Sequence, residues 1–179
     1  MKNIEGRTVD PETGDVLDKN ETGVLSFTGP NIFAGYLNNP EKTKEVFSDD
    51  GWFMTGDLGR MDEDGFLFIE GRLSRFSKIG GEMVSHESVE DVIAGLLSVY
   101  GHTSDDILCA VTGIEDGSKG ECLVLLSTVA VNSKWLGDNL RNKGIPNLWI
   151  PKHIKKTEKI PVLGTGKLDL RKLKELAEA

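Results

Sequence analysis

The chain has 179 residues, of which 38% are hydrophobic and 28% are charged, as is usual for a water-soluble globular protein. It contains no run of 18 or more apolar residues, and its first residues lack the apolar segment and cleavage site of a secretory signal. The net charge is −8, and no basic face is evident that could neutralise the phosphates of a nucleic acid. We therefore expect no membrane segment in this chain and no nucleic-acid partner.

The charge is unevenly distributed along the chain. Residues 1–70 carry 6 Lys and Arg against 15 Asp and Glu, whereas residues 71–179 carry 15 against 14. The length is compatible with one large domain or two small ones. Because the charge balance changes so sharply, the sequence predicts a domain boundary near Gly71.

The cysteines and histidines show no pattern typical of a metal site. Cys109 and Cys122 lie in apolar runs, which is typical of buried thiols that pack as small hydrophobic side chains. His86, His102 and His153 are scattered without the spacing of metal ligands. We therefore expect no metal site and a reducing, cytoplasmic location.

The first segment has the pattern of short strands joined by Pro- and Gly-containing turns. Asn39 and Pro40 are typical of the start of a helix, since Asn caps the first turn and Pro is tolerated there. The elements expected here are strands at 23–28, 52–58 and 65–70 and a short helix at 40–47.

From Gly71 onward the sequence mixes strands and helices. The elements expected are strands at 75–79, 83–84, 107–114, 122–129 and 152–159, a turn at 80–81, a linker at 115–120, and helices at 85–97, 133–143 and from 169 onward. Ser85 and Asp169 are typical helix caps. The predicted fold class is α+β, with a short-strand β subdomain followed by a small α+β domain that contains a mixed sheet and about three helices.

Asp57 and Arg72 are candidates for binding a nucleotide. Asp57 follows Thr55-Gly56 on an expected turn, and Arg72 opens the second segment. A carboxylate can accept hydrogen bonds from both hydroxyls of a ribose, and a guanidinium can bind a phosphate. Each also has an ordinary structural interpretation, Asp57 as a solvated turn residue and Arg72 as an ion-pair partner, and these alternatives stay open.

Lys167 follows Gly164-Thr165-Gly166 near the C-terminus. The Walker pattern fails here, because Pro161 stands at its first position and Leu168 follows the lysine. A lysine on a flexible Gly-rich loop could still reach an anionic site after a domain movement, or it could be a solvated loop residue. The lysines of 152–159 could likewise be a docking patch or a solvated strand edge.

Four motifs in one order resemble the last third of the adenylate-forming ligases, a family of acyl-CoA synthetases, peptide-synthetase adenylation domains and luciferases. The motifs are at 23–43, 51–58, 71–72 and 161–167, and together they cover almost the whole chain. The resemblance implies that Asp57 binds the ribose of ATP, that Arg72 contacts the nucleotide, and that Lys167 is catalytic in forming the adenylate.

The resemblance also implies a domain organisation. Residues 1–70 would be the end of a truncated large AMP-binding domain, and residues 71–179 would be a mobile C-terminal lid. The hinge would lie near 72–75, at Leu73 and Ser74. Ser74 departs from the Asp or Lys that is usual at the family's hinge.

Residues 75–85 resemble one branch of the family, the acyl–acyl-carrier-protein synthetases, which are often fused to a 2-acylglycerophosphoethanolamine acyltransferase. The segment reads Phe-x-Lys-Ile-x-Gly-Glu-Met-Val-Ser from residue 76. Met83 stands where the family usually has a basic residue. This branch implies a fatty acid as substrate and acyl carrier protein as partner, with lysophospholipid reacylation as the destination of the acyl group.

The resemblance implies a two-step reaction. A fatty carboxylate would attack the α-phosphate of Mg²⁺-bound ATP, and Lys167 would stabilise the developing charge. The lid would then swing so that Lys78, Gly80 and Gly81 line a channel for a phosphopantetheine thiol. The parent protein would be cytoplasmic, or associated with the cytoplasmic face of the inner membrane through other domains.

The 179 residues contain no Ser/Thr/Gly-rich phosphate loop and no fatty-acid pocket of the kind such enzymes use. The ATP site would thus be incomplete, and we expect this chain alone to be inactive. Two alternatives remain: the C-terminal part of an acyl- or aryl-CoA synthetase, and a non-catalytic carrier-binding module.

Overall fold

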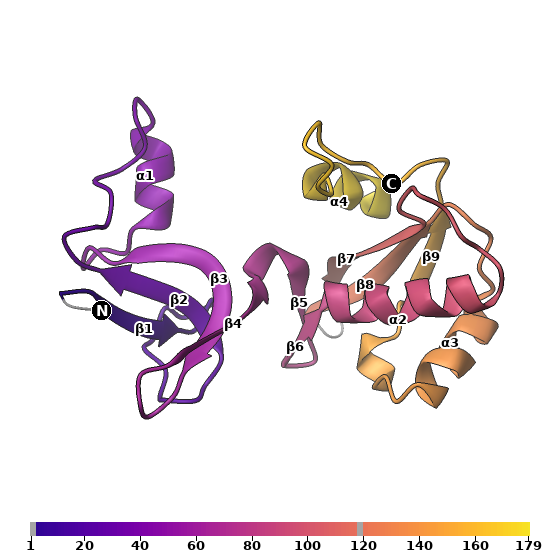
Figure 1. Ribbon diagram of the computed structural model, residues 1–179, viewed down its shortest axis with the longest axis horizontal. Helices are drawn as coiled ribbons and strands as arrows, with labels where there is room; N and C mark the ends of the chain where they lie inside the picture. The colour runs from indigo at the N-terminus through magenta and orange to yellow at the C-terminus, as the bar shows by residue number, and fades with distance from the viewer. Residues whose placement is uncertain (1–2, 118–119) are drawn as a thin grey trace. The chain divides into compact units, whose positions relative to one another are not determined.

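The computed structural model describes residues 3–117 and 120–179. The chain divides into two compact units, Met1–Leu73 and Ser74–Ala179, which are described separately (Figure 1). No helix among the described residues is long and apolar enough to cross a bilayer.

The N-terminal unit is built on a four-stranded antiparallel sheet in the order β1-β2-β3-β4. Its elements are β1 (Glu5–Val9), β2 (Gly23–Thr28), α1 (Pro40–Val46), β3 (Phe53–Met61) and β4 (Leu67–Arg72). Strand β3 extends to Met61 and β4 to Arg72, beyond their predicted ends, because the two strands pair from Met61↔Leu67 to Asp57↔Arg72. Strand β4 also begins two residues later than predicted. The small core contains Val9, Val24, Leu25 and Leu58.

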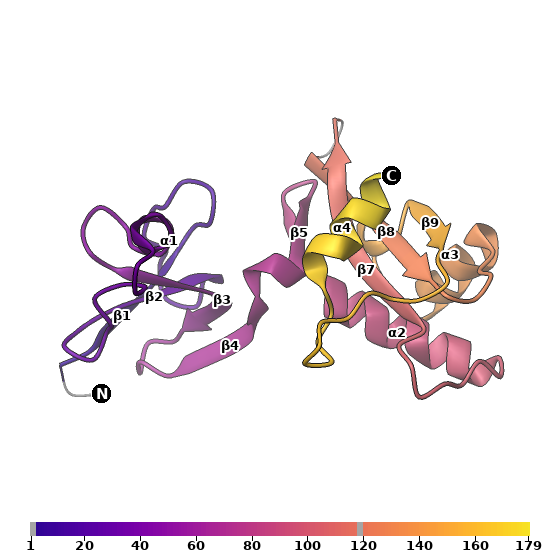
Figure 2. The ribbon, with the colours of Figure 1, turned by 90° about the horizontal axis from the view of Figure 1, so that it is seen from above.

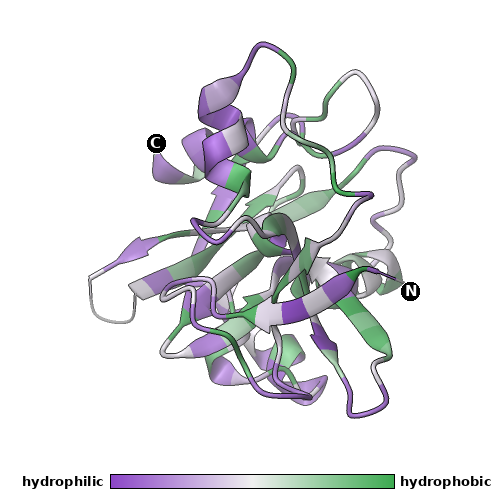
Figure 3. Ribbon diagram, turned by 90° about the vertical axis from the view of Figure 1, so that its left-hand side faces the viewer, coloured by the Kyte–Doolittle hydropathy of each residue, from purple (hydrophilic) through white to green (hydrophobic). Residues whose placement is uncertain are grey.

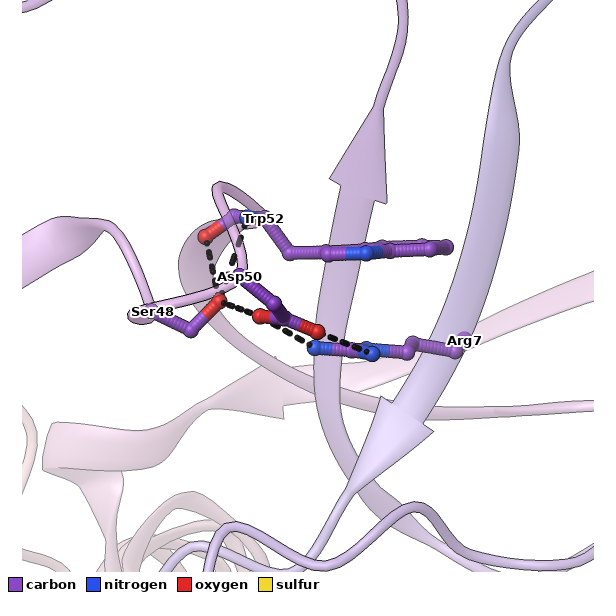
Figure 4. A network of polar contacts seen from close by, with 4 residues as sticks. All are labelled: Arg7, Ser48, Asp50 and Trp52. Atoms are coloured by element: carbon purple, nitrogen blue, oxygen red, sulfur yellow. Dashed lines mark hydrogen bonds and ion pairs between the residues drawn. The ribbon is translucent and has the colours of Figure 1, made fainter.

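A polar network ties strand β1 to the loop that precedes β3 (Figure 4). The Arg7 guanidinium lies 4.1 Å from the centre of the Trp52 ring and forms contacts of 2.9 and 3.1 Å with the Asp50 carboxylate. Ser48 donates to the same carboxylate at 2.5 Å and accepts from the Trp52 backbone N–H at 3.1 Å. Arg7 therefore fixes the start of the sheet by stacking and by charge at once.

The C-terminal unit contains a five-stranded mixed sheet, because β9 runs parallel to β8 while the other pairs are antiparallel. Its elements are η1 (Leu73–Arg75, shared with the end of the first unit), β5 (Phe76–Ile79), β6 (Glu82–Ser85), α2 (His86–Val99), β7 (Cys109–Asp116), β8 (Gly120–Ser127), α3 (Ser133–Asn142), η2 (Asn147–Trp149), β9 (His153–Lys156) and α4 (Leu170–Glu178). The predicted α+β class, mixed sheet and three helices are confirmed.

The helices cover both faces of this sheet (Figures 1 and 2). Alternate residues of β7 point to opposite sides: Val111 packs in the cluster with α2 and α3, whereas Ala110 packs with Leu173 of α4. Because helices cover both faces of the sheet, β7 and β8 have apolar residues at successive positions, which explains their continuous apolar sequences. In Figure 3 the helix beside the C-terminus is mostly hydrophilic in colour, while the strands carry both hydrophobic and hydrophilic residues.

Several predicted boundaries were wrong by a few residues. Arg75 belongs to η1 rather than to β5, and β7 begins at Cys109 rather than at Ile107, which is 40% exposed. The hairpin β7–β8 is shifted, so that residues 115–116 and 120 of the predicted linker lie in its strands. Residues 118–119 of that linker lie outside the described residues.

Candidate functional site

Asp57 lies within strand β3, as the predicted strand at 52–58 indicated, and its alternative predicted place on a turn is wrong. Leu58 pairs with Val24 and Met54 with Ser26, which leaves residues 55–57 opposite the single residue Leu25. Gly56 has a φ of 74°, a conformation that glycine adopts at low cost. The segment is therefore a β-bulge, which bends a strand and redirects its side chains.

Thr55 fixes the shape of this bulge. Its hydroxyl donates to the carbonyl oxygen of Leu25 at 2.9 Å and accepts from the backbone N–H of Asp57 at 3.0 Å. One oxygen thus connects β2 to the residue that carries the candidate carboxylate. No role for Thr55 was predicted from the sequence, because its partner Leu25 lies thirty residues away.

Arg72 lies directly opposite Asp57 at the end of β4. Its Nε contacts the Asp57 carboxylate at 2.8 Å, and its Nη1 donates to the carbonyl oxygen of Thr55 at 3.3 Å. The Arg72 side chain is 65% exposed and that of Asp57 27% exposed, so both are accessible from solvent. The structure therefore brings together two of the predicted site residues, as an exposed acid–guanidinium pair on a bulged strand.

Lys167 lies in the C-terminal unit, on an exposed turn just before α4. The turn is closed by Leu163 N–H to Lys167 O at 2.7 Å and Gly166 N–H to Leu163 O at 2.9 Å. Asp169 then caps α4 by accepting from Lys172 N–H at 3.1 Å. The lysine thus stands where this small, internally bonded loop closes, just before helix α4, which packs through the buried Leu173.

The predicted thiol-channel loop is the tight connection between β5 and β6. Gly80 and Gly81 have φ of 59° and 89°, as a two-residue hairpin turn of the primed type requires. Beside them, the Lys78 N–H donates to Glu121 at 2.8 Å. Backbone geometry alone therefore accounts for both glycines, and the same loop presents exposed backbone.

The predicted hinge residues lie at the division between the units. Leu73 ends the first unit and Ser74 begins the second, and both belong to η1. The next residue, Arg75, is only 9% exposed and forms an ion pair with Glu90 of α2. Burial raises the pKa of Glu90, while its hydrogen bond from Val111 N–H and the nearby Arg75 act in the opposite direction.

A second buried polar pair lies near the ion pair. The Oγ of Ser77 and the Nε2 of His86 are 2.9 Å apart, and both side chains are buried. Burial first, and Arg75 second, lower the pKa of His86 to about 4. A neutral buried histidine that is hydrogen-bonded in this way stabilises the start of α2 rather than binding a metal.

No three His, Cys, Asp or Glu side chains gather into a possible metal site in the described part of the chain. Cys109 and Cys122 are buried free thiols, as predicted. Burial raises the pKa of the Cys109 thiol to about 12, with a further contribution from Glu90. A protonated thiol of this kind is a poor nucleophile and a poor ligand.

The bulge carries an exposed acid–guanidinium pair, and the C-terminal unit separately carries an exposed lysine loop. Groups of this kind suit polar and anionic ligands, and comparisons with known proteins give the class. No protein-family model matches the chain. It is 33% identical over 177 residues to luciferin 4-monooxygenase of Photuris pensylvanica, an alignment that covers 96% of this chain and 31% of the relative. It is 34% identical over 175 residues to 4-coumarate–CoA ligase 1 of Arabidopsis thaliana, covering 96% and 30%.

Comparison with solved structures gives the same class of protein as comparison of the sequences. ATP-bound MatB from Rhodopseudomonas palustris matches with a TM-score of 0.70 and 29% identity, covering 98% of this chain and 34% of that one. The chain therefore corresponds to the C-terminal part of the proteins that form the AMP-binding, adenylate-forming ligase family. It spans about a third of the length of these relatives.

Proposed function

We propose that the chain is the C-terminal part of an ATP-dependent acid–thiol ligase that makes an acyl-adenylate and passes the acyl group to a phosphopantetheine thiol. The observation that carries this proposal is the contact between Asp57 and Arg72 on the bulge of β3. A structural neighbour at 29% identity is described as ATP-bound, which supports ATP as the nucleotide.

Asp57 and Arg72 would bind the nucleotide in complementary ways. The carboxylate of Asp57 can accept hydrogen bonds from both ribose hydroxyls. Arg72 contacts Asp57 through Nε and Thr55 through Nη1, and Nη2 takes part in neither contact. Its exposed guanidinium can therefore reach an anionic group of the nucleotide while it keeps the carboxylate oriented.

Lys167 would act in the first chemical step. The oxygen of a carboxylate would attack the α-phosphorus of ATP, the bond from that phosphorus to the bridging oxygen would break, and pyrophosphate would leave with the bond electrons. An ammonium group placed beside these oxygens stabilises the charge that develops on them. Its exposed loop lets Lys167 approach and withdraw without disturbing a packed core.

The second step would need the C-terminal unit to change its position. In this proposal residues 1–70 complete the large domain, residues 71–179 form the lid, and Leu73 and Ser74 are the hinge. The thiol attacks the acyl carbonyl and AMP leaves with the bond electrons. Lys78, Gly80 and Gly81 would line the thiol's path, where a loop without side chains permits close approach.

We propose acyl carrier protein as the thiol partner and a fatty acid as the acid, in a cytoplasmic enzyme that supplies lysophospholipid reacylation. The support is the resemblance of residues 75–85 to that branch, together with the exposed Lys156 at the end of β9 and Lys159 just after it, which suit an acidic carrier. A second candidate acceptor is CoA, because one relative at 34% identity is a 4-coumarate–CoA ligase.

Pyrophosphate exchange by the full-length ligase tests the first step. We expect fatty-acid-dependent exchange of labelled pyrophosphate into ATP, which Lys167→Ala lowers by about 10²–10³-fold, as for other lost transition-state donors. Lys172→Ala is the matched control, since it removes the same charge from an exposed position on α4. Equal exchange rates in the two variants would refute the role of Lys167, and pyrophosphate release by the 179-residue chain alone would refute its dependence on the large domain.

Comparing acyl carrier protein with CoA as acceptors, under the same conditions, tests the partner. A kcat/KM at least tenfold higher with the carrier supports the carrier proposal, and a higher value with CoA supports the second candidate.

A further inference from the structure

Two arginines stand on either side of the two proposed hinge residues, and each is bound to a different unit. Arg72 is held in the N-terminal unit by its strand register with Asp57 and by the contacts already described. Arg75 is held in the C-terminal unit by Glu90. Only Leu73 and Ser74 lie between these two attachments.

The attachment of Arg75 involves the backbone as well as the carboxylate. Arg75 Nη2 contacts Glu90 Oε2, and Arg75 Nη1 donates to the carbonyl oxygen of Val111 at 3.4 Å. The other Glu90 oxygen accepts from the backbone N–H of Val111 at 2.6 Å. Both polar groups of one residue in β7 are thus bound by the ion pair, so Arg75 is connected to a helix and to an edge strand of the sheet.

The Arg75–Glu90 pair is also deeply placed. The two side chains are 11% and 13% exposed, and Val111 is fully buried. Breaking a buried ion pair is strongly unfavourable, because the partner that remains is an uncompensated charge. Arg75 therefore cannot leave its site during an ordinary domain movement.

We propose that the Arg75–Glu90 pair is the fixed end of the hinge and confines backbone rotation between the units to Leu73 and Ser74. This proposal rests on the proposed function, since an alternating lid needs a swivel. A short swivel limits the number of orientations that the lid can adopt, so that Lys167 and the Gly80–Gly81 loop reach the nucleotide accurately. Arg75 and Glu90 are positioning residues, since they act through the lid.

Limited tryptic cleavage of the 179-residue chain tests the clamp without reference to activity. Trypsin cuts after Arg or Lys, and the hinge region offers Arg72 and Arg75. In the native chain we expect cleavage after Arg72 to be at least tenfold faster than cleavage after Arg75. Glu90→Gln, which removes the charge that holds Arg75, should raise cleavage after Arg75 at least tenfold.

The control is Leu140→Ala, which removes a buried side chain of α3 and weakens the same unit without touching the pair. Cleavage is measured well below the unfolding temperature of each variant. If native Arg75 is cut as fast as Arg72, or if Glu90→Gln and Leu140→Ala give the same cleavage pattern, the clamp proposal is wrong.

The two half-reactions of the full-length ligase provide the functional test. We expect Glu90→Gln to lower kcat of both pyrophosphate exchange and thioester formation about tenfold, with KM for ATP changed less than twofold. Leu140→Ala should leave both unchanged at a temperature where it is folded. If the wild-type enzyme shows no exchange, the proposed function fails and the cleavage result still decides the clamp. If it is active and Glu90→Gln matches Leu140→Ala, the clamp proposal fails alone.

Discussion

Replacing Thr55 by Val tests whether one hydroxyl holds the carboxylate of Asp57 in place. The substitution keeps the branched shape and removes two hydrogen bonds, to Leu25 O at 2.9 Å and from Asp57 N–H at 3.0 Å. Each such bond contributes about 1 kcal/mol, and a buried N–H that loses its partner costs about 1–3 kcal/mol. Because the bulge is only half-buried, we expect the N-terminal unit to lose about 2–3 kcal/mol of unfolding free energy.

Urea unfolding followed by tryptophan fluorescence measures this loss. Trp52 is the only tryptophan of residues 1–73, so a background with Trp135→Phe and Trp149→Phe reports on the N-terminal unit alone. Thr55→Ser retains the hydroxyl and should remain within about 1 kcal/mol of the parent, while Thr55→Val also raises KM for ATP in the full-length ligase. A Val variant as stable as the parent, or a Ser variant as unstable as Val, would refute the reasoning.

Two further predictions concern buried or stacked charges. Burial lowers the pKa of His86 to about 4, so the unfolded chain binds more protons than the folded chain between pH 6.5 and 4. The contribution of neutral His86 to the unfolding free energy is therefore complete above pH 6.5 and is lost as the pH falls towards 4, by about 3 kcal/mol at 1.36 kcal/mol per pKa unit. His86→Gln should flatten this pH dependence in urea titrations. Arg7→Lys should lose the stacking on Trp52, which lowers the unfolding free energy by about 1 kcal/mol, and should change the Trp52 fluorescence emission. Asp50→Asn leaves the stacking in place and should change the emission less. Equal emission spectra for both variants would contradict the stacking argument.

The elements of the fold could be predicted where local chemistry decides them. Asn39, Ser85 and Asp169 each accept a hydrogen bond from the backbone N–H three residues later, and each begins a helix as expected. The apolar runs that predicted strands here are those of β7 and β8, and the structure buries these strands on both faces. Strand ends were less accurate, because pairing partners rather than local sequence set them.

The geometry of the site depends on contacts that are distant in sequence. Gly56 signals a change of chain direction, but only the pairing with β2 distinguishes a bulge from a turn. The contact of Asp57 with Arg72 follows from the register of β3 and β4, which the sequence does not state. The burial of Arg75 also depends on a remote partner: Glu90 adjoins Val89 in the buried stripe of α2, and that position is the one signal that could have indicated it.

Arg72 links the proposed site to the proposed hinge. It is the last residue of β4, and its contact with Asp57 holds the end of that strand against β3. A nucleotide whose ribose binds the Asp57 carboxylate would share that carboxylate with Arg72 and would offer phosphate oxygens to the same guanidinium. On the proposed function, the attachment of the chain just before Leu73 would thus depend on the bound nucleotide, whereas the attachment at Arg75 would not. The bound nucleotide would then affect only the attachment of the hinge to the N-terminal unit at Arg72. The attachment to the C-terminal unit at Arg75 would stay the same throughout the reaction.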